Sequence, residues 1–239
     1  MSTTAHTRTR ALLGEEGLLR LQQSHVAVIG LGGVGGHCAE ALARSGIGRL
    51  LVLDADVVEE SNLNRQLIAT KNTLGTPKAA AMRARIEEIS DCRVNAVQAF
   101  LLDENVETLL PDDLDFIVDA VDTVAAKLAL VRYAFMRNIP IVSAMGAGNR
   151  LDPSAFYVTD IYKTEGCPLA RAVRQGCRKL GVEHLAVVVS RETPVAMQGV
   201  LEEEGRRTPG SVSFVPGAAG LVLAGYVVRT LAGGTCASL

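Results

Sequence analysis

Side chains that bind phosphate are concentrated in one short stretch of the chain, DADVVEESNLNRQ. The Arg65 guanidinium can form a bidentate hydrogen bond to two phosphate oxygens. The side-chain amides of Asn62, Asn64 and Gln66 can donate to phosphate or ribose without adding charge. Lys78 follows in the first turn of an expected helix, where its ammonium and the free backbone N–H groups would face the same anion. A cation at a helix N-terminus is mildly unfavourable because it faces the positive end of the helix dipole. The position of Lys78 therefore suggests that an anion binds between its ammonium and the helix N-terminus. These residues predict a polyphosphate site, although Lys78 could also be an exposed surface lysine.

A glycine-rich turn, GLGGVG, precedes this stretch and lies between an apolar run and a helical pattern. Gly30, Gly32, Gly33 and Gly35 permit a tight turn and close approach of phosphate, with the next helix N-terminus facing the anion. Asp54 follows at the spacing expected of an acid that binds ribose at the end of a second strand. The combination predicts nucleotide binding, and the alternative is a purely structural turn.

Two aspartates in VDAVDT, Asp119 and Asp122, follow the expected fourth strand. Doubly wound sheets bind ligands outside the carboxyl ends of their strands, and a carboxylate there can hold Mg²⁺ on a triphosphate. Asp122 is the predicted magnesium ligand, whereas Asp119 is expected to orient the loop or cap the next helix. With the phosphate-binding set, this favours chemistry at a phosphoryl group. An NAD-dependent dehydrogenase is disfavoured because no histidine pairs obviously with a carboxylate, and His184 stands alone.

The elements that position these residues alternate between strand and helix. Helices are predicted over 15–23, 34–45, 77–89 (with Thr76 as N-cap) and 123–137, and strands over 25–29, 50–53, 94–98, 116–118 and 139–143. This rhythm predicts an α/β fold with a doubly wound, mainly parallel, Rossmann-like sheet. After residue 152, short strands near 156–159 and 186–189 flank a helix near 169–179. We therefore predict one domain, with a nucleotide-binding core over 12–150 and a substrate and dimer extension over 151–239.

Composition narrows the class of protein. The chain has 239 residues, 48% of them hydrophobic, and a net charge of −2, which suits one large globular domain and disfavours a strongly basic nucleic-acid binder. The first ten residues are polar and resemble no signal peptide, so a cytoplasmic protein is expected. The five cysteines form no CxxC pair, which fits a reducing compartment and predicts no zinc site.

Two C-terminal segments have unusual composition. Residues 217–234 are apolar and about as long as a membrane span, but they contain several glycines and Arg229. A buried or dimer-interface helix is therefore predicted, and no stable membrane span. Residues 201–211, LEEEGRRTPGS, are charged and rich in turn formers, and are expected to be mobile.

The motifs GLGGVG, DADVVEESNLNRQ, GTPKA and VDAVDT, taken together over residues 12–146, resemble the adenylating fold of ubiquitin-activating enzymes and of bacterial ThiF/MoeB-type enzymes. The resemblance implies that ATP is bound and that a substrate carboxylate attacks the α-phosphate. By position, Asp54 and Asp56 would lie at the ribose, Asn64, Arg65, Gln66 and Lys78 at the phosphates, and Asp122 at Mg²⁺. It also implies a homodimer in which Arg8, just before the first predicted helix, reaches the partner's site. Arg10 is the near alternative, and a solvated basic tail the other.

The chain is similar to the tRNA threonylcarbamoyladenosine dehydratases, through ARSGIGRL in its first half and SAMGAGNRLDP, YKTEGCPLARAVR and SVSFVPGAAGL in its C-terminal half. This resemblance implies a modified tRNA as substrate, whose threonylcarbamoyl carboxylate is activated by ATP and then closes to a hydantoin with release of AMP. A cysteine desulfurase or a sulfur acceptor is a further candidate partner. The alternative function is an adenylyltransferase for a carrier protein ending in Gly-Gly, against which the absent CxxC pairs count. A non-catalytic or NAD-binding module is a third alternative.

One expected helix carries two further candidates. Cys167 begins it, where a thiol could have a lowered pKa and be reactive, although a structural cysteine is the favoured interpretation. Arg171, Arg174 and Arg178 have spacing that predicts a common face, which would either contact tRNA phosphates or be solvated.

Overall fold

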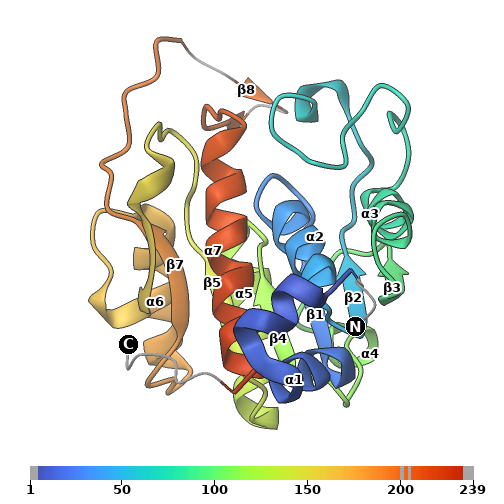
Figure 1. The fold of residues 1–239 in the computed structure, drawn as a ribbon. Helices are drawn as coiled ribbons and strands as arrows, with labels where there is room; N and C mark the ends of the chain where they lie inside the picture. The colour runs from blue at the N-terminus through green and yellow to red at the C-terminus, as the bar shows by residue number, and fades with distance from the viewer. Residues whose placement is uncertain (1–4, 200–201, 204–205, 234–239) are drawn as a thin grey trace.

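Seven strands form one sheet in the order β3-β2-β1-β4-β5-β7-β6 in a computed structural model that describes residues 5–199, 202–203 and 206–233 (Figure 1). The strands are β1 (His25–Ile29), β2 (Arg49–Leu53), β3 (Arg93–Val97), β4 (Phe116–Asp119), β5 (Ile141–Ala144), β6 (Phe156–Asp160) and β7 (Ala186–Ser190). All neighbours pair in parallel except β6, which is antiparallel to β7. The predicted doubly wound, mainly parallel sheet is confirmed, and its first five strands follow the dinucleotide-binding order.

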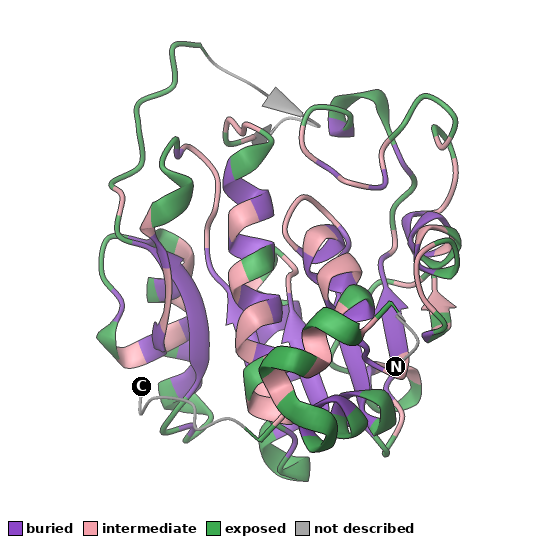
Figure 2. Cartoon of the chain, in the orientation of Figure 1, coloured by how far each residue is buried: buried purple, intermediate pink, exposed green. Residues whose placement is uncertain are grey.

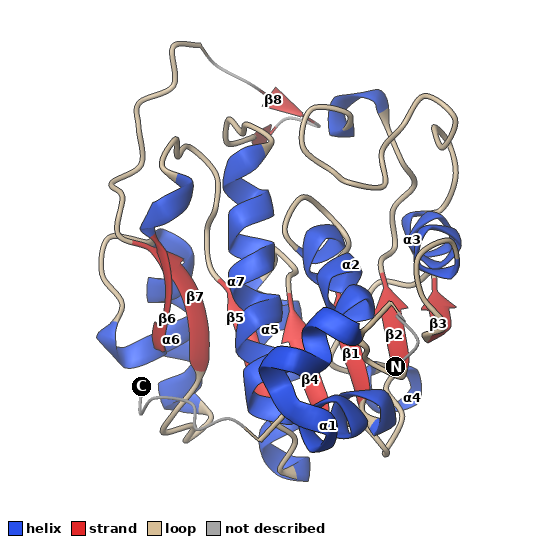
Figure 3. Cartoon of the chain, viewed as in Figure 1, coloured by secondary structure: helices blue, strands red, loops and turns tan. Residues whose placement is uncertain are grey.

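Helices cover both faces of this sheet because its central strands are apolar on both sides (Figures 2 and 3). The helices are α1 (Thr7–Gln23), α2 (Gly35–Ser45), α3 (Lys78–Glu87), α4 (Val106–Leu109), α5 (Val124–Arg137), α6 (Pro168–Lys179) and α7 (Phe214–Leu231). One face is packed by residues of α1, α2, α3 and α7, and the other by residues of α4, α5 and α6. Strands from residues 12–150 and from 151–239 thus belong to a continuous sheet.

The structure differs from the predicted boundaries at several points. Helix α1 begins at Thr7 and is kinked at Gly14 (φ 75°), so Arg8 lies inside a helix and not before it. The N-cap of α3 is Pro77 and not Thr76, because the carbonyl of Thr76 accepts from Val58 N (2.9 Å) in an extended segment. The short helix α4 was not predicted. Part of the predicted mobile segment, residues 201 and 204–205, lies outside the described residues, and its described part includes the pair β8 (Glu202–Glu203) and β9 (Arg206–Arg207).

Helix α7 is the apolar segment predicted to be buried or at an interface. Its 18 residues have a mean hydropathy of 1.5, which makes it a candidate membrane span by length and composition, but half of it is buried. Val215, Ala219, Leu223 and Val227 pack into the core together with α2. A Cβ on Gly220 would lie 2.3 Å from the carbonyl oxygen of Val34, so this contact requires glycine. The predicted buried helix is confirmed, and Gly234 lies outside the described residues.

Candidate active site

The glycine turn after β1 packs directly against the loop after β4, at the point where the strand order of the sheet reverses. Gly30 has a positive φ of 88°, and a Cβ there would lie 2.7 Å from the carbonyl oxygen of Ala120. A Cβ on Gly35 would lie 1.8 Å from the carbonyl oxygen of Gly30, and one on Gly33 3.1 Å from Pro216. Glycine is therefore required for this packing, which brings the N-terminus of α2 to the carboxyl edge of the sheet.

Asp54 holds the glycine turn onto the end of β2. Its Oδ2 accepts a hydrogen bond from Leu31 N at 2.6 Å, and its Oδ1 accepts one from Asp56 N at 2.9 Å. Burial raises the pKa of the Asp54 carboxyl, and these two backbone donors together with the charge of Lys78 lower it without offsetting the burial. Asp54 thus lies beside the predicted nucleotide-binding turn, and its contact with a ribose stays a prediction.

Lys78 forms an ion pair with Asp56 at the start of α3. The distance from Nζ to Oδ2 is 2.7 Å, and the backbone N–H of Lys78 donates to the Asp56 carbonyl at 2.9 Å. The lysine side chain is almost fully buried, whereas that of Asp56 is more than half exposed. The anion expected between Lys78 and the helix N-terminus is therefore, in this structure, a carboxylate of the protein. A phosphate at this position would compete with Asp56 for the same ammonium.

The NLNRQ segment forms a hydrogen-bonded loop opposite the glycine turn. Asn62 is buried at the end of the 3₁₀ turn η1 (Glu60–Asn62), and its Oδ1 accepts from Glu59 N at 3.2 Å. Arg65 Nη1 donates to the carbonyl of Ser61 and to Asn64 Oδ1, both at 2.9 Å. Asn62 therefore shapes the loop from within, while Arg65 lies at its surface with further guanidinium hydrogens for a ligand.

Gln66 is buried and faces the glycine turn. A Cβ on Gly32 would lie 4.0 Å from Gln66 Nε2, and Gln66 Oε1 is a buried acceptor with no hydrogen-bond partner. Buried polar atoms normally have partners, so this acceptor is incompletely satisfied. The sequence prediction that Gln66 belongs with the glycine turn is consistent with this arrangement.

The two aspartates of VDAVDT have different surroundings. Asp119 is fully buried, and its Oδ1 accepts from Val121 N at 3.2 Å, so it orients the loop as predicted. Asp122 is exposed, and it forms no hydrogen bond or ion pair within the part of the chain that the structure describes. Its carboxylate is free to bind a ligand above the carboxyl ends of β1 and β4. Sequence reasoning missed the partner of Asp119, which is the buried Lys127. A single lysine in the apolar run VAAKLALV was the available signal.

The connection from β7 to α7, in its described residues 191–199, 202–203 and 206–213, forms a crossing segment above this edge of the sheet (Figure 1). Near its beginning, Glu192 accepts hydrogen bonds from the backbone of Leu151 and Asp152. Near its end, Gly210 N donates to Asn149 Oδ1 at 2.7 Å, and the Ser211 carbonyl accepts from Asn64 Nδ2 at 3.1 Å. The crossing segment is thus tied both to the loop after β5 and to the NLNRQ loop, and it borders the site.

Arg8 lies far from the site of its own chain. His6, two residues earlier, borders Gly46, since a Cβ on Gly46 would lie 3.5 Å from the imidazole. Gly46 follows the C-terminus of α2, whereas the glycine turn precedes the N-terminus of that helix, and 11 helical residues rise by about 16 Å. Arg10, the alternative, has its Nε 3.2 Å from Glu15 Oε2. An action of Arg8 on its own chain's nucleotide is therefore disfavoured.

Comparison with known proteins matches this arrangement to a family. The sequence model of the ThiF family matches residues 6–238. The chain belongs to the ThiF family.

Within this family, the similarity is to the tRNA threonylcarbamoyladenosine dehydratases. One from Bacillus subtilis (strain 168) is 41% identical over 237 residues, which cover 94% of this chain and 93% of that protein. The structure of the E. coli tRNA N6-threonylcarbamoyladenosine dehydratase in complex with ATP matches with a TM-score of 0.84 at 33% identity, covering 94% of this chain and 92% of that chain. An adenylyltransferase and sulfurtransferase of Anopheles gambiae is 39% identical, but over only 55% of this chain and 30% of that protein. The predicted resemblance is confirmed, and the carrier-protein alternative is not favoured.

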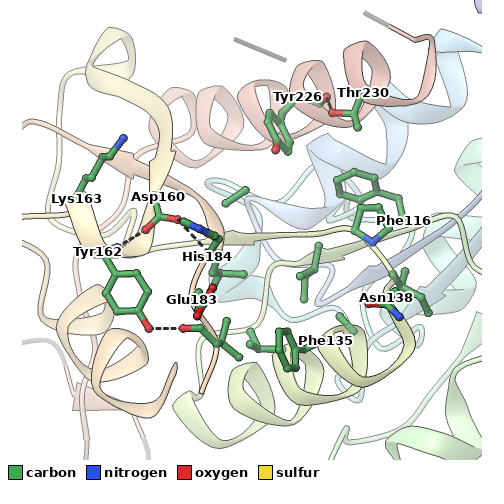
Figure 4. Close-up of a pocket in the computed structure, with 18 residues that line it drawn as sticks. Phe116, Phe135, Asn138, Asp160, Tyr162, Lys163, Glu183, His184, Tyr226 and Thr230 are labelled. Carbon is green, nitrogen blue, oxygen red and sulfur yellow. Dashed lines mark hydrogen bonds and ion pairs between the residues drawn. The ribbon is translucent and has the colours of Figure 1, made fainter. Parts of the chain in front are cut away.

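The ThiF-family chain also has a cavity of about 830 Å³ away from this site (Figure 4). It lies at the amino ends of β4, β5 and β7, on the opposite edge of the sheet from the glycine turn. Phe116, Phe135 and Tyr226 line its apolar side, and Asp160 with His184 its polar side, at an Oδ2–Nδ1 distance of 3.5 Å. It contains none of the predicted site residues. The candidate active site is instead the open carboxyl edge.

Of the candidates on α6, Cys167 is structural, as favoured, and Arg174 is more structural than predicted. Cys167 is 6% exposed and caps the helix, with its Sγ accepting from Ala170 N at 3.5 Å. Arg174 does not share an open face with its neighbours, because its Nη1 donates to the Thr164 carbonyl at 2.8 Å and to Thr164 Oγ1 at 2.6 Å. Arg171 and Arg178 are exposed, and the Arg178 guanidinium lies 5.7 Å from the Tyr162 ring centroid. Two of the three predicted cations therefore stay available to a partner.

Among the described residues, no group of three or more His, Cys, Asp or Glu side chains is arranged to hold a metal ion. Cys38, Cys92, Cys167 and Cys177 are free thiols, and Cys236 lies outside the described residues. A metal that binds through a nucleotide needs fewer protein ligands, since Mg²⁺ is usually held by one or two carboxylates together with phosphates and water. The exposed carboxylate of Asp122, which has no partner in the described part of the chain, fits that mode of binding.

Proposed function

We propose that this protein is an ATP-dependent enzyme that dehydrates threonylcarbamoyladenosine in tRNA to its cyclic hydantoin form. The observation that carries the proposal is the near full-length match to a tRNA threonylcarbamoyladenosine dehydratase, at 41% identity over 94% of the chain. The geometry supports the proposal, because the glycine turn, Arg65 and Lys78, and Asp122 lie on segments that follow the carboxyl ends of β1, β2 and β4, beside the switch point of the sheet.

The proposed reaction has two steps. A carboxylate oxygen of the threonyl group attacks the α-phosphorus of ATP, forming an acyl adenylate and releasing pyrophosphate. The urea nitrogen attached to the adenine then attacks the activated carbonyl carbon, loses its proton, and expels AMP. The nucleoside loses one water overall, whose oxygen leaves in AMP. The second step is intramolecular, so the enzyme needs to hold the chain in a reactive conformation and exclude water.

The residues of the chain contribute mainly charge and position. The glycine turn and the N-terminus of α2 would receive the phosphates, while Arg65 and Lys78 would neutralise charge on their oxygens in the transition state. Asp122 would hold Mg²⁺, which when bound screens the phosphate charge and orients the leaving pyrophosphate. Asp54 and Asp56 would face the ribose. Lys78 would exchange its ion pair with Asp56 for a phosphate, so nucleotide binding would free the Asp56 carboxylate.

We further propose that the working unit is a cytoplasmic homodimer that binds tRNA through exposed cations such as Arg171 and Arg178. Large apolar side chains are exposed on α1 and on α7, among them Leu12 (88% exposed) and Leu221 (57%). Burial of such a surface would stabilise a dimer. The same contact would bring Arg8 towards a partner's nucleotide.

The reaction class is tested by incubating the protein with ATP, Mg²⁺ and tRNA that carries threonylcarbamoyladenosine. Mass spectrometry of the digested nucleosides should show the loss of one water, with one AMP and one pyrophosphate formed per nucleoside converted. The reaction without ATP is the control. ATP hydrolysis or exchange stimulated only by a protein ending in Gly-Gly, with the nucleoside unchanged, would instead support the carrier-protein function.

Cys167→Ala is expected to retain most of the activity. The scheme requires no thiol intermediate, and the thiol is buried as a helix cap. Loss of the cap should destabilise the protein by about 1 kcal/mol, as is typical for N-cap replacements. Thermal unfolding and nucleoside conversion measured on the same preparation separate the two effects. A folded but inactive Cys167→Ala protein would favour a thioester or sulfur-transfer role for the thiol, and a sulfur-transfer partner would then be sought.

A further inference from the structure

A fully buried ion pair lies directly beneath the loop that carries Asp122. Lys127 and Asp119 have no solvent exposure, and their Nζ–Oδ2 distance is 3.0 Å. Lys127 Nζ also donates to Ser143 Oγ at 3.1 Å and to the Ala144 carbonyl at 2.7 Å, which uses its three hydrogens. The Ser143 hydroxyl donates in turn to Asp119 Oδ2. The network connects the end of β4, the first half of α5 and the end of β5.

Stability alone does not account for this network. Removing two charges from water is costly, and well-packed apolar residues often serve as well or better at such positions. The neighbours of Lys127 on α5 are themselves apolar and buried, including Ala126 and Leu130. An apolar side chain at position 127 would therefore suit the helix. The presence of the network is better explained by the fixed local geometry that its buried charges impose on the surrounding backbone.

That geometry concerns the turn between Asp119 and Asp122. Asp119 uses one carboxylate oxygen for Lys127 and Ser143 and the other for Val121 N, at 3.2 Å. On its other side the turn is held by β1, because Ala120 N donates to the Ile29 carbonyl at 2.8 Å. Asp122 is the next residue after this fixed turn, and its own side chain has no partner among the described residues. The position of its carboxylate is therefore set through Asp119 and its partners.

We propose that Lys127, through Asp119 and Ser143, is a positioning residue that fixes where Asp122 meets the bound nucleotide. This inference rests on the proposed function, in which Asp122 acts at the phosphates. Lys127 itself touches no substrate. Its loss would let the 120–123 turn shift, and a shift of about 1 Å at a reacting group can reduce turnover by about 100-fold.

The test uses a double variant, Asp119→Asn with Lys127→Met, which leaves no buried charge and keeps an acceptor for Val121 N. Asp103→Asn with Arg132→Met is the matched control, because Arg132 lies on the same helix and pairs with Asp103 (2.7 Å) on the exposed side. Ser143→Ala is a milder variant that removes one member of the network and remains informative should the double variant not fold.

Three measurements are made on each protein: ATP–pyrophosphate exchange in the presence of substrate tRNA, ATP binding by calorimetry, and hydrogen exchange at the Val121 amide. The double variant should lose about 100-fold in kcat with little change in ATP affinity, and its Val121 amide should exchange at least about tenfold faster. Ser143→Ala should lower kcat and accelerate hydrogen exchange at the Val121 amide in the same way, but by less. A role in stability alone would lower the melting temperature and leave kcat of the folded protein unchanged.

Equal kcat and equal Val121 exchange in the network variants and the control would overturn the inference. Absence of both ATP–pyrophosphate exchange and nucleoside conversion in the wild-type protein would refute the proposed function instead. In that case hydrogen exchange at the Val121 amide tests the network by itself. Faster hydrogen exchange in the network variants than in the control requires that the network order the turn, and unaltered hydrogen exchange excludes this role.

Discussion

Asp122→Asn is expected to reduce ATP–pyrophosphate exchange by about 100-fold or more while leaving the protein folded, because the amide keeps the shape of the side chain and loses the charge that Mg²⁺ requires. The fold should tolerate the change, since the Asp122 side chain is exposed and makes no hydrogen bond or ion pair with any described residue. A loss of about 100-fold corresponds to about 2.7 kcal/mol of transition-state stabilisation, which is modest for a ligand of a catalytic metal.

The measurement is kcat and KM for ATP, with thermal unfolding on the same preparation. Asp91→Asn, an exposed aspartate just before β3 at the amino edge of the sheet, is the matched control and should be as active as the wild type. The Mg²⁺ concentration for half-maximal activity should also rise in Asp122→Asn and not in the control. Wild-type turnover by Asp122→Asn would assign the metal to another carboxylate, with Asp56 the next candidate because it lies beside Lys78.

The parts of the fold that the sequence predicted are those governed by local pattern. The β-branched runs HVAVI and AVVVS are strands because they suit a sheet covered on both faces, and GLGGVG is a tight turn because its glycines meet backbone atoms at Ala120 and Gly30 itself. Spacing along the chain therefore sufficed to place the glycine turn, Asp54 and Asp122 at one edge of the sheet.

The parts that were missed depend on contacts between distant elements. The spacing of Arg171, Arg174 and Arg178 fixes their side of α6, but it does not indicate that carbonyls near Thr164 take Arg174 as a donor. Helical periodicity predicts that a lysine such as Lys127 lies on the surface. Its hydrogen bonds to Asp119 and Ser143 follow only from the arrangement of β4 and β5 in the sheet. The start of α1 was missed because Gly14 kinks the helix, and a glycine in a helical pattern is ordinarily taken as a boundary.

The site itself was predicted as a set of residues but not as a set of contacts. Asn62, Asn64 and Arg65 were grouped as donors to phosphate, yet the side chain of Asn62 is used within η1 and that of Asn64 for the crossing segment. Such local bonds are invisible in a motif, because asparagine is equally suited to a turn and to a ligand. Of this group, Arg65 has the larger number of hydrogens left for an anion.

Arg8→Ala is expected to reduce activity by about 100- to 1000-fold, as removal of an arginine supplied to a phosphoryl transition state does. In its own chain the residue lies on the part of α1 that contacts the far end of α2, about one helix length from the glycine turn. An arginine this remote can contribute only in a neighbouring protomer. The exposed apolar side chains of α1 and α7 provide the surface through which two protomers would meet.

Mixing two inactive variants distinguishes action in the partner from action in the same chain. When Arg8→Ala and Asp122→Asn proteins exchange subunits in equal amounts, half of the dimers contain one of each. In such a dimer one site has both an intact Asp122 and an intact Arg8 from the partner, so the mixture should recover about a quarter of the wild-type activity. If Arg8 acted within its own chain, no site in any dimer would have both residues.

Arg10→Ala mixed with Asp122→Asn is the control, because Arg10 already pairs with Glu15 and its loss should leave the variant active before mixing. A mixture of the two inactive variants that stays inactive, with subunit exchange demonstrated by mass spectrometry, would exclude the trans arginine.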